Sequence, residues 1–197
     1  PSCPQTNPSV AEQEANLVAF GSERPWISND FGETWQSIPT NTLNGDKLNG
    51  RIKSLTFAAA TKLYAGTMKG GIYRFDKQED QWQQIRLDNQ SGLPANFALP
   101  VTDIAIDPQD DTGNSIYITF GGSGDYRHVW HFNGTQWESR SGPPSNGSNQ
   151  ANLLDIQHNA IVVDPLFPNH LYVGADIGVW YSADRGNTWQ PCSKGLP

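Results

Sequence analysis

The chain is poor in basic residues and long apolar runs, and each shortage excludes a class of partner. It holds 13 Lys and Arg against 20 Asp and Glu, a net charge of −7. Phosphate binding needs clustered Lys and Arg, so nucleic acid and anionic membrane surfaces are not expected partners. No run of about eighteen apolar residues occurs, which predicts no membrane insertion. No long stretch has helical periodicity either, so we expect almost no helix.

The usual signatures of catalysis and metal binding are also missing. The chain has 4 His and 2 Cys, with neither a helical His pair nor a Cys cluster, so we expect no metal and no cofactor. No Gly-x-Ser-x-Gly elbow occurs, and the glycine-rich run 121–124 lacks the lysine of a phosphate-binding loop. His128 and His131 flank Trp130 on an expected strand, and we predict that they face opposite sides of the sheet.

One pattern does occur twice, near opposite ends of the chain: Ser-x-Asp-x-Gly-x-Thr-Trp. The Asp carboxylate can accept hydrogen bonds from its own turn, the Gly can take a positive φ, and the Trp can bury its ring against a neighbouring unit. Each residue type thus has a folding role, and we expect a structural rather than catalytic function for both copies. They comprise Ser28, Asp30, Gly32, Thr34 and Trp35, and Ser182, Asp184, Gly186, Thr188 and Trp189.

The repeat extends over the whole chain. Closing tryptophans recur about 50 residues apart, at Trp35, Trp82, Trp137 and Trp189. A second aromatic row, Trp26, Tyr73, Trp130 and Trp180, falls at one common strand position, which favours packing between repeats over a sugar-stacking row. Four strands per period with a closing Trp predict an all-β β-propeller of four-stranded antiparallel blades. We expect an extended N-terminal arm at 1–13 and blades at 14–50, 51–98, 99–150 and 151–197, the first without a convincing inner strand.

The twice-used pattern resembles the Asp-box (BNR) repeat of sialidase-like and sortilin-like β-propellers. The last unit, 161–182, is similar to blades of secreted bacterial BNR proteins and of endoglucanases that act on xyloglucan. Propellers of this superfamily usually have more than four blades. The four units therefore predict either a compact ring or, as we favour, part of a larger propeller completed by further blades or self-association. Sialidase activity is disfavoured, because the chain has Arg24-Pro25-Trp26 where sialidases carry Arg-Ile-Pro.

Two interpretations of function remain open. The first, which we favour because no catalytic signature is visible, is a secreted or cell-surface propeller that binds a glycan or protein ligand or serves as a structural module. The second is a fragment of an Asp-box glycoside hydrolase of the endoglucanase or xyloglucanase type. It would use a carboxylate pair at the central channel, and the catalytic candidates are Asp103 and Asp125.

A glycine-rich loop carries the candidate ligand-binding residues Asp125, Tyr126, Arg127 and His128. They combine charge, stacking and hydrogen bonding, although a variable connection is the simpler interpretation. Cys3 and Cys192 lie near the two ends, and a disulfide between them would close nearly the whole chain. Such a bond would imply an oxidising compartment. The expected localisation is therefore extracellular, periplasmic or on the cell surface, and a chain that begins at Pro1 suggests processing.

Overall fold

The protein is an all-β propeller arc built from antiparallel sheets. The computed structural model describes residues 16–42, 47–85, 98–123, 127–142 and 153–192. These residues contain no helix, and hence none that could cross a membrane. The strands form four sheets, one for each blade.

Blade 1 comprises β1 (Val18–Gly21), β2 (Pro25–Ser28) and β3 (Gln36–Ser37), and blade 2 comprises β4 (Ile52–Ala59), β5 (Lys62–Thr67), β6 (Ile72–Asp76) and β7 (Gln81–Gln84). Blade 3 comprises β8 (Val101–Ile106), β9 (Ile116–Phe120), β10 (Val129–Phe132) and β11 (Trp137–Ser139), and blade 4 comprises β12 (His158–Val163), β13 (Leu171–Ala175), β14 (Gly178–Ser182) and β15 (Gln190–Pro191).

Each blade is a meander in which every strand pairs with the next one along the chain. Blades 2, 3 and 4 have the expected four strands, whereas blade 1 has three among the described residues. The expected N-terminal arm at 1–13 lies outside the described residues. The predicted blade boundaries after residues 50, 98 and 150 stay predictions.

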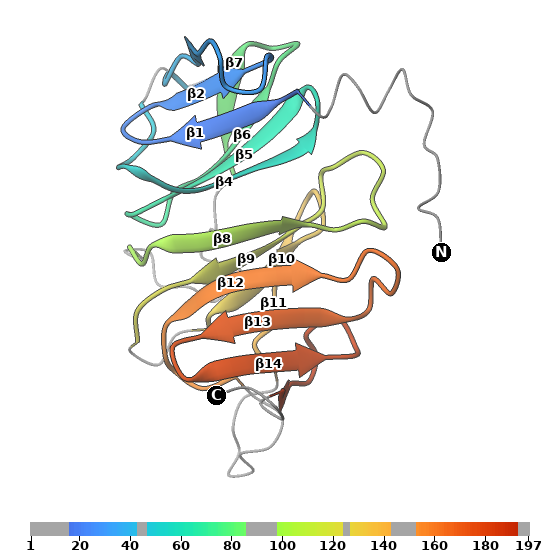
Figure 1. Cartoon of the computed structure of the whole chain (residues 1–197). Coiled ribbons are helices and arrows are strands. Elements are labelled where there is room, and N and C mark those ends of the chain that lie inside the picture. The colour runs from blue at the N-terminus through green and yellow to red at the C-terminus, as the bar shows by residue number, and fades with distance from the viewer. Residues whose placement is uncertain (1–15, 43–46, 86–97, 124–126, 143–152, 193–197) are drawn as a thin grey trace.

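The blades follow one another in an open row. Inner strand β4 packs beside β8, and β8 packs beside β12, while β1 lies next to β4. Blade 1, in blue, and blade 4, in red, occupy opposite ends of this row (Figure 1). The described residues therefore form an arc and not the compact ring that the repeat count alone left open.

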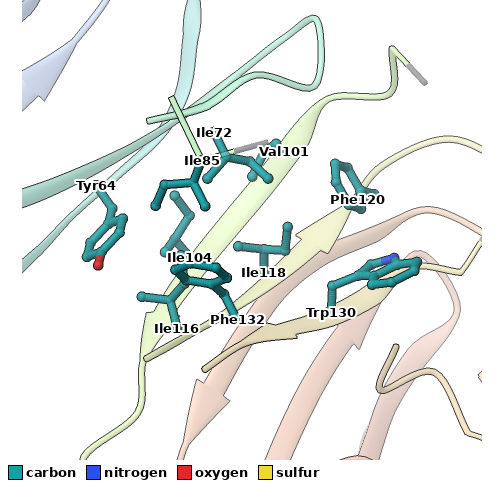
Figure 2. Close-up of a cluster of buried hydrophobic side chains, with 10 residues drawn as sticks. All are labelled: Tyr64, Ile72, Ile85, Val101, Ile104, Ile116, Ile118, Phe120, Trp130 and Phe132. Carbon is teal, nitrogen blue, oxygen red and sulfur yellow. The ribbon is translucent and has the colours of Figure 1, made fainter. Parts of the chain in front are cut away.

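The core is divided among the spaces between consecutive blades. We call the face of a blade that is turned toward the next blade its forward face, and the opposite one its rear face. Tyr64 and Ile72 on the forward face of blade 2 meet Ile104, Ile118 and Trp130 on the rear face of blade 3, as Figure 2 shows. Similar clusters join blade 1 to blade 2 and blade 3 to blade 4. Alternation along each strand produces this arrangement, because successive side chains point to opposite faces.

The second aromatic row lies at one register position on the rear faces. Trp26, Tyr73, Trp130 and Trp180 stand opposite Phe20, Ala65, Ile118 and Val173 on the preceding strands. Three of these rings are buried between blades, and Trp26, at the rear of blade 1, is half-buried. The row therefore packs blade against blade and is not a sugar-stacking surface in blades 2 to 4.

Candidate functional site

Blades 3 and 4 gather their polar side chains at two opposite ends of the strands. Successive connections in an antiparallel meander alternate between the ends. At the end that we call the loop end, β9 leads to β10, β13 leads to β14, and residues 153–157 lead into β12. At the turn end lie the β8–β9 connection and the turns that close β10–β11 and β14–β15. Each end carries a polar cluster with a buried histidine.

The loop end of blades 3 and 4 holds two stacked imidazoles beside a carboxylate. The rings of His128 and His158 lie 4.8 Å apart between centroids. Nε2 of His128 lies 2.9 Å from Oδ1 of Asp155, and Nδ1 lies 3.2 Å from the carbonyl oxygen of Phe120. Both ring nitrogens thus face acceptors. The two contacts are satisfied together when the ring is an imidazolium or when the carboxyl group keeps the proton.

The second imidazole of the pair, His158, is completely buried. Its Nδ1 donates to the carbonyl oxygen of Ile156 at 2.7 Å, and its ring packs against Trp180. Burial, reinforced by the neighbouring His128, lowers the pKa of His158 to about 4. The ring is therefore neutral at pH 7, with its proton on Nδ1. Its buried Nε2 has no hydrogen-bond partner among the described residues.

Exposed polar groups surround these imidazoles. Asn159 Nδ2 donates to Asp176 Oδ1 at 2.8 Å, and Gln157 Nε2 donates to Asn159 Oδ1 at 2.7 Å. The side chain of Asp155 is 42% exposed. The loop end thus presents two carboxylates and two amides to solvent, held in place by hydrogen bonds. Such groups can bind the hydroxyls of a polar ligand.

The catalytic candidate Asp103 lies on inner strand β8, and its carboxylate links two blades. Oδ2 accepts from the backbone N–H of Ile161 in blade 4, and Oδ1 accepts from the N–H of Ile104, each at 2.9 Å. Burial raises the pKa of Asp103, outweighing these hydrogen bonds. Ser54 occupies the equivalent position in blade 2 and donates to the carbonyl oxygen of Val101 in blade 3 at 3.0 Å. In both blades 2 and 3, the side chain at this position therefore forms a hydrogen bond to the backbone of the following blade.

Only part of the predicted ligand loop can be placed. Asp125 and Tyr126 lie outside the described residues, whereas Arg127 is exposed and His128 is 1% exposed. His128 is therefore not at the surface, where the prediction placed it, and its contact with the half-exposed Asp155 carboxylate is made from below.

The prediction that His128 and His131 face opposite sides is wrong. The first stacks on His158 of blade 4, and the second lies 3.7 Å from an Asp107 oxygen that pairs with Arg185 of blade 4. Both rings therefore face blade 4. The alternation fails because β10 begins at Val129, one residue after His128.

A polar cleft of about 480 Å³ opens at the turn end of the same two blades. At its base the Asp107 carboxylate is paired with Arg185 and accepts from Ser115 Oγ at 3.2 Å. Burial alone would raise the pKa of Asp107, but contacts with His131, Gln109 and Arg185 outweigh it, and the pKa lies well below its usual range. The remaining lining residues are Asp110, Thr112, Asn114, Asn133, Gly134 and Thr135.

The cleft contains a Ser–His–Asp set, but the geometry is not that of a catalytic triad. Ser115 Oγ lies 2.8 Å from Nε2 of His131, and Asp107 approaches the same nitrogen. A triad needs its carboxylate on the other ring nitrogen, where it fixes the tautomer. Nδ1 of His131 is buried and has no partner among the described residues. We therefore interpret this group as a structural network that binds blade 4 to blade 3.

The two Ser-x-Asp-x-Gly-x-Thr-Trp segments form the same turn. Ser28 Oγ donates to Asp30 Oδ1 at 2.6 Å, and the backbone N–H of Thr34 donates to the same oxygen at 2.8 Å. The bond from Ser28, followed by those from Thr34, lowers the pKa of Asp30 to about 2. Ser182, Asp184 and Thr188 repeat the pattern in blade 4. Every side-chain contact of these carboxylates is made inside their own turn.

The two closing tryptophans differ in their acceptors. Trp189 Nε1 donates to the carbonyl oxygen of Arg140 in blade 3 at 2.6 Å, whereas Trp35 Nε1 donates to Gly32 of its own turn at 3.0 Å. Trp189 is 3% exposed and Trp35 is 40% exposed. The difference follows from position, because the described residues place no blade behind blade 1.

Two further expectations concern cysteines and metal. Cys192 is exposed and pairs with no cysteine among the described residues, and Cys3 lies outside them, so the Cys3–Cys192 disulfide stays a prediction of the sequence alone. Within the described ranges, no group of three or more His, Cys, Asp and Glu side chains could hold a metal ion.

Comparisons with known proteins support the fold and point to one class of relatives. No family model matches the chain. Over 140 residues it is 29% identical to an oligoxyloglucan-reducing end-specific xyloglucanase of Emericella nidulans, a match covering 68% of this chain and 16% of that protein. The structure is similar to the GH74 xyloglucanase of Xanthomonas campestris, with a TM-score of 0.62 and 19% sequence identity. This similarity covers 91% of this chain and 28% of that one.

A third similarity is to the extracellular domain of a one-component system of B. thetaiotaomicron. Its TM-score is 0.60 at 15% identity, with 92% of this chain and 22% of that one covered. The chain thus spans less than a third of each of these relatives. At such identities the solved structures establish the propeller fold and no more.

Proposed function

We propose that the chain is part of a xyloglucanase-like propeller and that the loop end of blades 3 and 4 contacts a β-linked glucan. The observation that carries the proposal is the sequence match over 140 residues to a xyloglucanase. This favours the glycoside hydrolase interpretation over the general binding module that the sequence alone suggested. An extracellular location is part of the proposal, and the similarity to the extracellular domain of a one-component system supports it.

The chemistry of the loop end supports this choice of surface. A glucan presents rows of hydroxyls, which pair with carboxylates and amides of fixed orientation. Asp155 is oriented by buried His128, and Asp176 is oriented by Asn159. The turn end is less suited, because its central carboxylate, Asp107, is 3% exposed and already paired.

Hydrolysis would need two carboxyl groups across the glycosidic bond. Asp103 and Asp125 remain the candidates for that pair, although Asp125 lies outside the described residues, and Asp155 and Asp176 are two further carboxylates at the loop end. A raised pKa, as at Asp103, suits a general acid that must keep its proton.

Binding without hydrolysis is the second candidate function, and one observation favours it. Both carboxylate oxygens of Asp103 accept backbone N–H groups, one of them from blade 4, which favours a structural role for this carboxylate in joining the two blades. In that case the chain would hold the glucan while the reacting carboxylates come from elsewhere in a larger propeller.

The test combines a binding measurement with a sugar-release assay on the purified chain. We expect retardation in affinity gels that contain xyloglucan. The double change Asp155→Asn and Asp176→Asn should weaken binding about tenfold, the equivalent of about 1.4 kcal/mol. Asp164→Asn is the matched control, because Asp164 caps Leu166 at the turn end of blade 4 and an Asn oxygen can still accept that bond.

The outcomes separate the hypotheses. Reducing-sugar release that Asp103→Asn abolishes, with binding retained, would support hydrolysis by this chain. Retardation without sugar release would support the binding function. Absence of both on xyloglucan and on cello-oligosaccharides would contradict the proposed function.

A further inference from the structure

The inner strands of blades 2, 3 and 4 share a β-bulge near the loop end. In blade 2, this is the end where residues 47–51 lead into β4 and where β5 leads to β6. The register of β4 on β5 shifts between Ile52 and Ser54, so Lys53 is an extra residue without a partner on β5. Thr102 of β8 and Asn159 of β12 are the corresponding extra residues. Such bulges redirect a side chain and are common beside functional sites.

The bulges bring one polar side chain of each blade to the same rim. Strands β4, β8 and β12 follow one another along the row of blades (Figure 1). Thr102 Oγ1 donates to the carbonyl oxygen of His158 at 2.6 Å, directly beside Asn159. Asn159 belongs to the candidate ligand-binding groups of blade 4, through its hydrogen bond to Asp176. Lys53 is therefore the counterpart, in blade 2, of a candidate ligand-binding residue.

Two more cations lie around Lys53, and we call the three side chains the basic patch. Arg51 lies two residues earlier, and its carbonyl oxygen accepts from the N–H of Met68 at 2.8 Å, which places the β5–β6 turn beside it. Lys69 follows in that turn, and its Cγ lies only 3.1 Å from the position that a Cβ on Gly50 would take. The stem of Lys69 thus packs on a residue without a side chain. All three cations are exposed.

The protein does not neutralise the basic patch. Among the described residues, no carboxylate forms an ion pair with any of its three cations, whereas Arg140 and Arg185 are paired with Glu138 and Asp107. The chain has only 13 Lys and Arg against 20 Asp and Glu, so three unpaired cations on one blade end are a marked concentration of positive charge. Charges of one sign gathered in this way raise the local concentration of anions.

The rest of the loop end favours an anion whose charges are far apart. Blade 4 presents Asp155 and Asp176 at the same end, and the whole chain has a net charge of −7. A nucleic acid or an anionic membrane carries phosphates continuously, and it would meet these carboxylates as soon as it extended beyond blade 2. A polysaccharide with occasional carboxylates avoids this repulsion, because the hydroxyls of its neutral sugars can pair with the polar groups of blade 4.

We propose that the basic patch binds carboxylate groups of an acidic polysaccharide at the loop end of blade 2. Arg51 can hold a carboxylate through two parallel N–H donors, and Lys53 and Lys69 add two point charges. The choice of a polysaccharide rests on the proposed function, whereas the carboxylate contact does not, because it uses residues of another blade.

The test measures binding of the full chain to two immobilised polymers that share a β-linked glucan backbone. Carboxymethylcellulose of low substitution carries carboxylates, and hydroxyethylcellulose carries neutral substituents. At low salt we expect the carboxylated polymer to bind about tenfold more tightly. This preference should shrink as salt rises toward about 0.5 M, because exposed charges are screened.

Variants of the basic patch connect the preference to its residues. The triple change Arg51→Gln, Lys53→Gln and Lys69→Gln should remove the preference and leave binding to hydroxyethylcellulose unchanged. Lys53→Gln alone should reduce the preference about twofold. Lys77→Gln is the matched control, because it removes one exposed charge from the turn end of the same blade. Unchanged circular dichroism spectra would show that the variants are folded.

The outcomes separate this proposal from the proposed function. Patch-dependent binding of carboxymethylcellulose without any binding of hydroxyethylcellulose would support the carboxylate site and count against the glucan contact at blades 3 and 4. Equal binding of the two polymers, a preference that the triple variant keeps, or an equal loss in Lys77→Gln would overturn the proposal. Tighter binding of single-stranded DNA than of carboxymethylcellulose, at equal charge concentration, would also overturn it, because the partner would then be a nucleic acid.

Discussion

At the scale of single residues, a neighbouring blade determines the protonation state of buried groups. His158 lies between His128 of blade 3 and Trp180 of its own blade, and its Nε2 is buried without a partner among the described residues. The charged form would lose its hydration there and would lie against a second imidazole. Its pKa therefore falls from 6.5 to about 4.

This shift predicts that acid destabilises the protein through His158. Between pH 6.5 and pH 4 the unfolded chain binds this proton and the folded chain does not, so the free energy of unfolding decreases as the pH falls. The full effect is about 3 kcal/mol and is complete near pH 4. Urea midpoints measured from pH 7 to pH 4.5 should fall more steeply for the unchanged chain than for His158→Asn.

The Asn variant is a suitable comparison because its amide can still donate toward the Ile156 carbonyl. We expect it to be less stable at pH 7, since it loses the stacking on His128. The lowered pKa values of Asp30 and Asp184 remove stability only below about pH 3.8 and do so in both proteins. Parallel pH profiles for the two chains would contradict the role given to His158.

Residue-scale features were predictable where partners are close in sequence. The hydrogen bonds of Asp30 and Asp184 could be expected, because Ser and Thr stand two residues before and four after each carboxylate. The stack of His128 on His158 could not, because the two rings come from neighbouring blades and no local spacing signals the contact. The loop that was singled out supplied one member of the cluster, and its other contributors lie about thirty residues away.

At the scale of elements, a turn of one blade docks on the backbone of the preceding blade. Gly186 has a φ of +83°, and a Cβ there would lie 2.8 Å from Arg140 Cβ and 2.9 Å from the Arg140 carbonyl oxygen. Gly32, in the matching turn of blade 1, has a φ of +92°, and the nearest atom to a Cβ there would be in its own Trp35, at 3.4 Å. The two glycines share the strained backbone and differ in the neighbour.

This pair predicts unequal costs for the same substitution. Gly32→Ala should cost about 1 kcal/mol from the left-handed backbone alone. Gly186→Ala should cost about 2–4 kcal/mol, because the new methyl group also pushes the turn away from blade 3. Urea denaturation of both variants measures the difference. Equal losses would show that the turn of blade 4 does not depend on its contact with blade 3.

The sequence predicts the blades themselves better than it predicts how the row of blades is closed. The recurrence of a closing Trp about every 50 residues predicted four-stranded antiparallel blades, and blades 2 to 4 have them. The sequence also indicated that blade 1 lacks a convincing inner strand, and three strands are found there among the described residues. The sequence could not distinguish a closed ring from an arc, because the rear face of blade 1 and the forward face of blade 4 read like any other blade face.

At the scale of the whole molecule, stability should be distributed along the row of blades. Among the described residues, the strands that pack closely across blades belong to consecutive blades, as in other repeat architectures, where stability is a sum of units and nearest-neighbour interfaces. Blade 3 is covered on both faces, and Ile116, Tyr117 and Ile118 of β9 have no exposed surface. Blade 1 is covered on one face and has three described strands.

We therefore predict a gradient of hydrogen exchange, with the slowest amides in β9 and the fastest in β1 to β3. Local opening of blade 1 breaks one interface between blades, whereas opening of blade 3 breaks two.

Ile118→Ala should lower the free energy of unfolding by about 2–5 kcal/mol, because it weakens the interface of blades 2 and 3, and it should lower protection in both blades. Ile27→Ala, at the interface of blades 1 and 2, should lower protection there and leave β13 unchanged. Exchange followed by mass spectrometry on both variants resolves the blades separately. A uniform loss of protection across all four blades from Ile27→Ala would show that the arc unfolds as one unit and that the nearest-neighbour description is wrong.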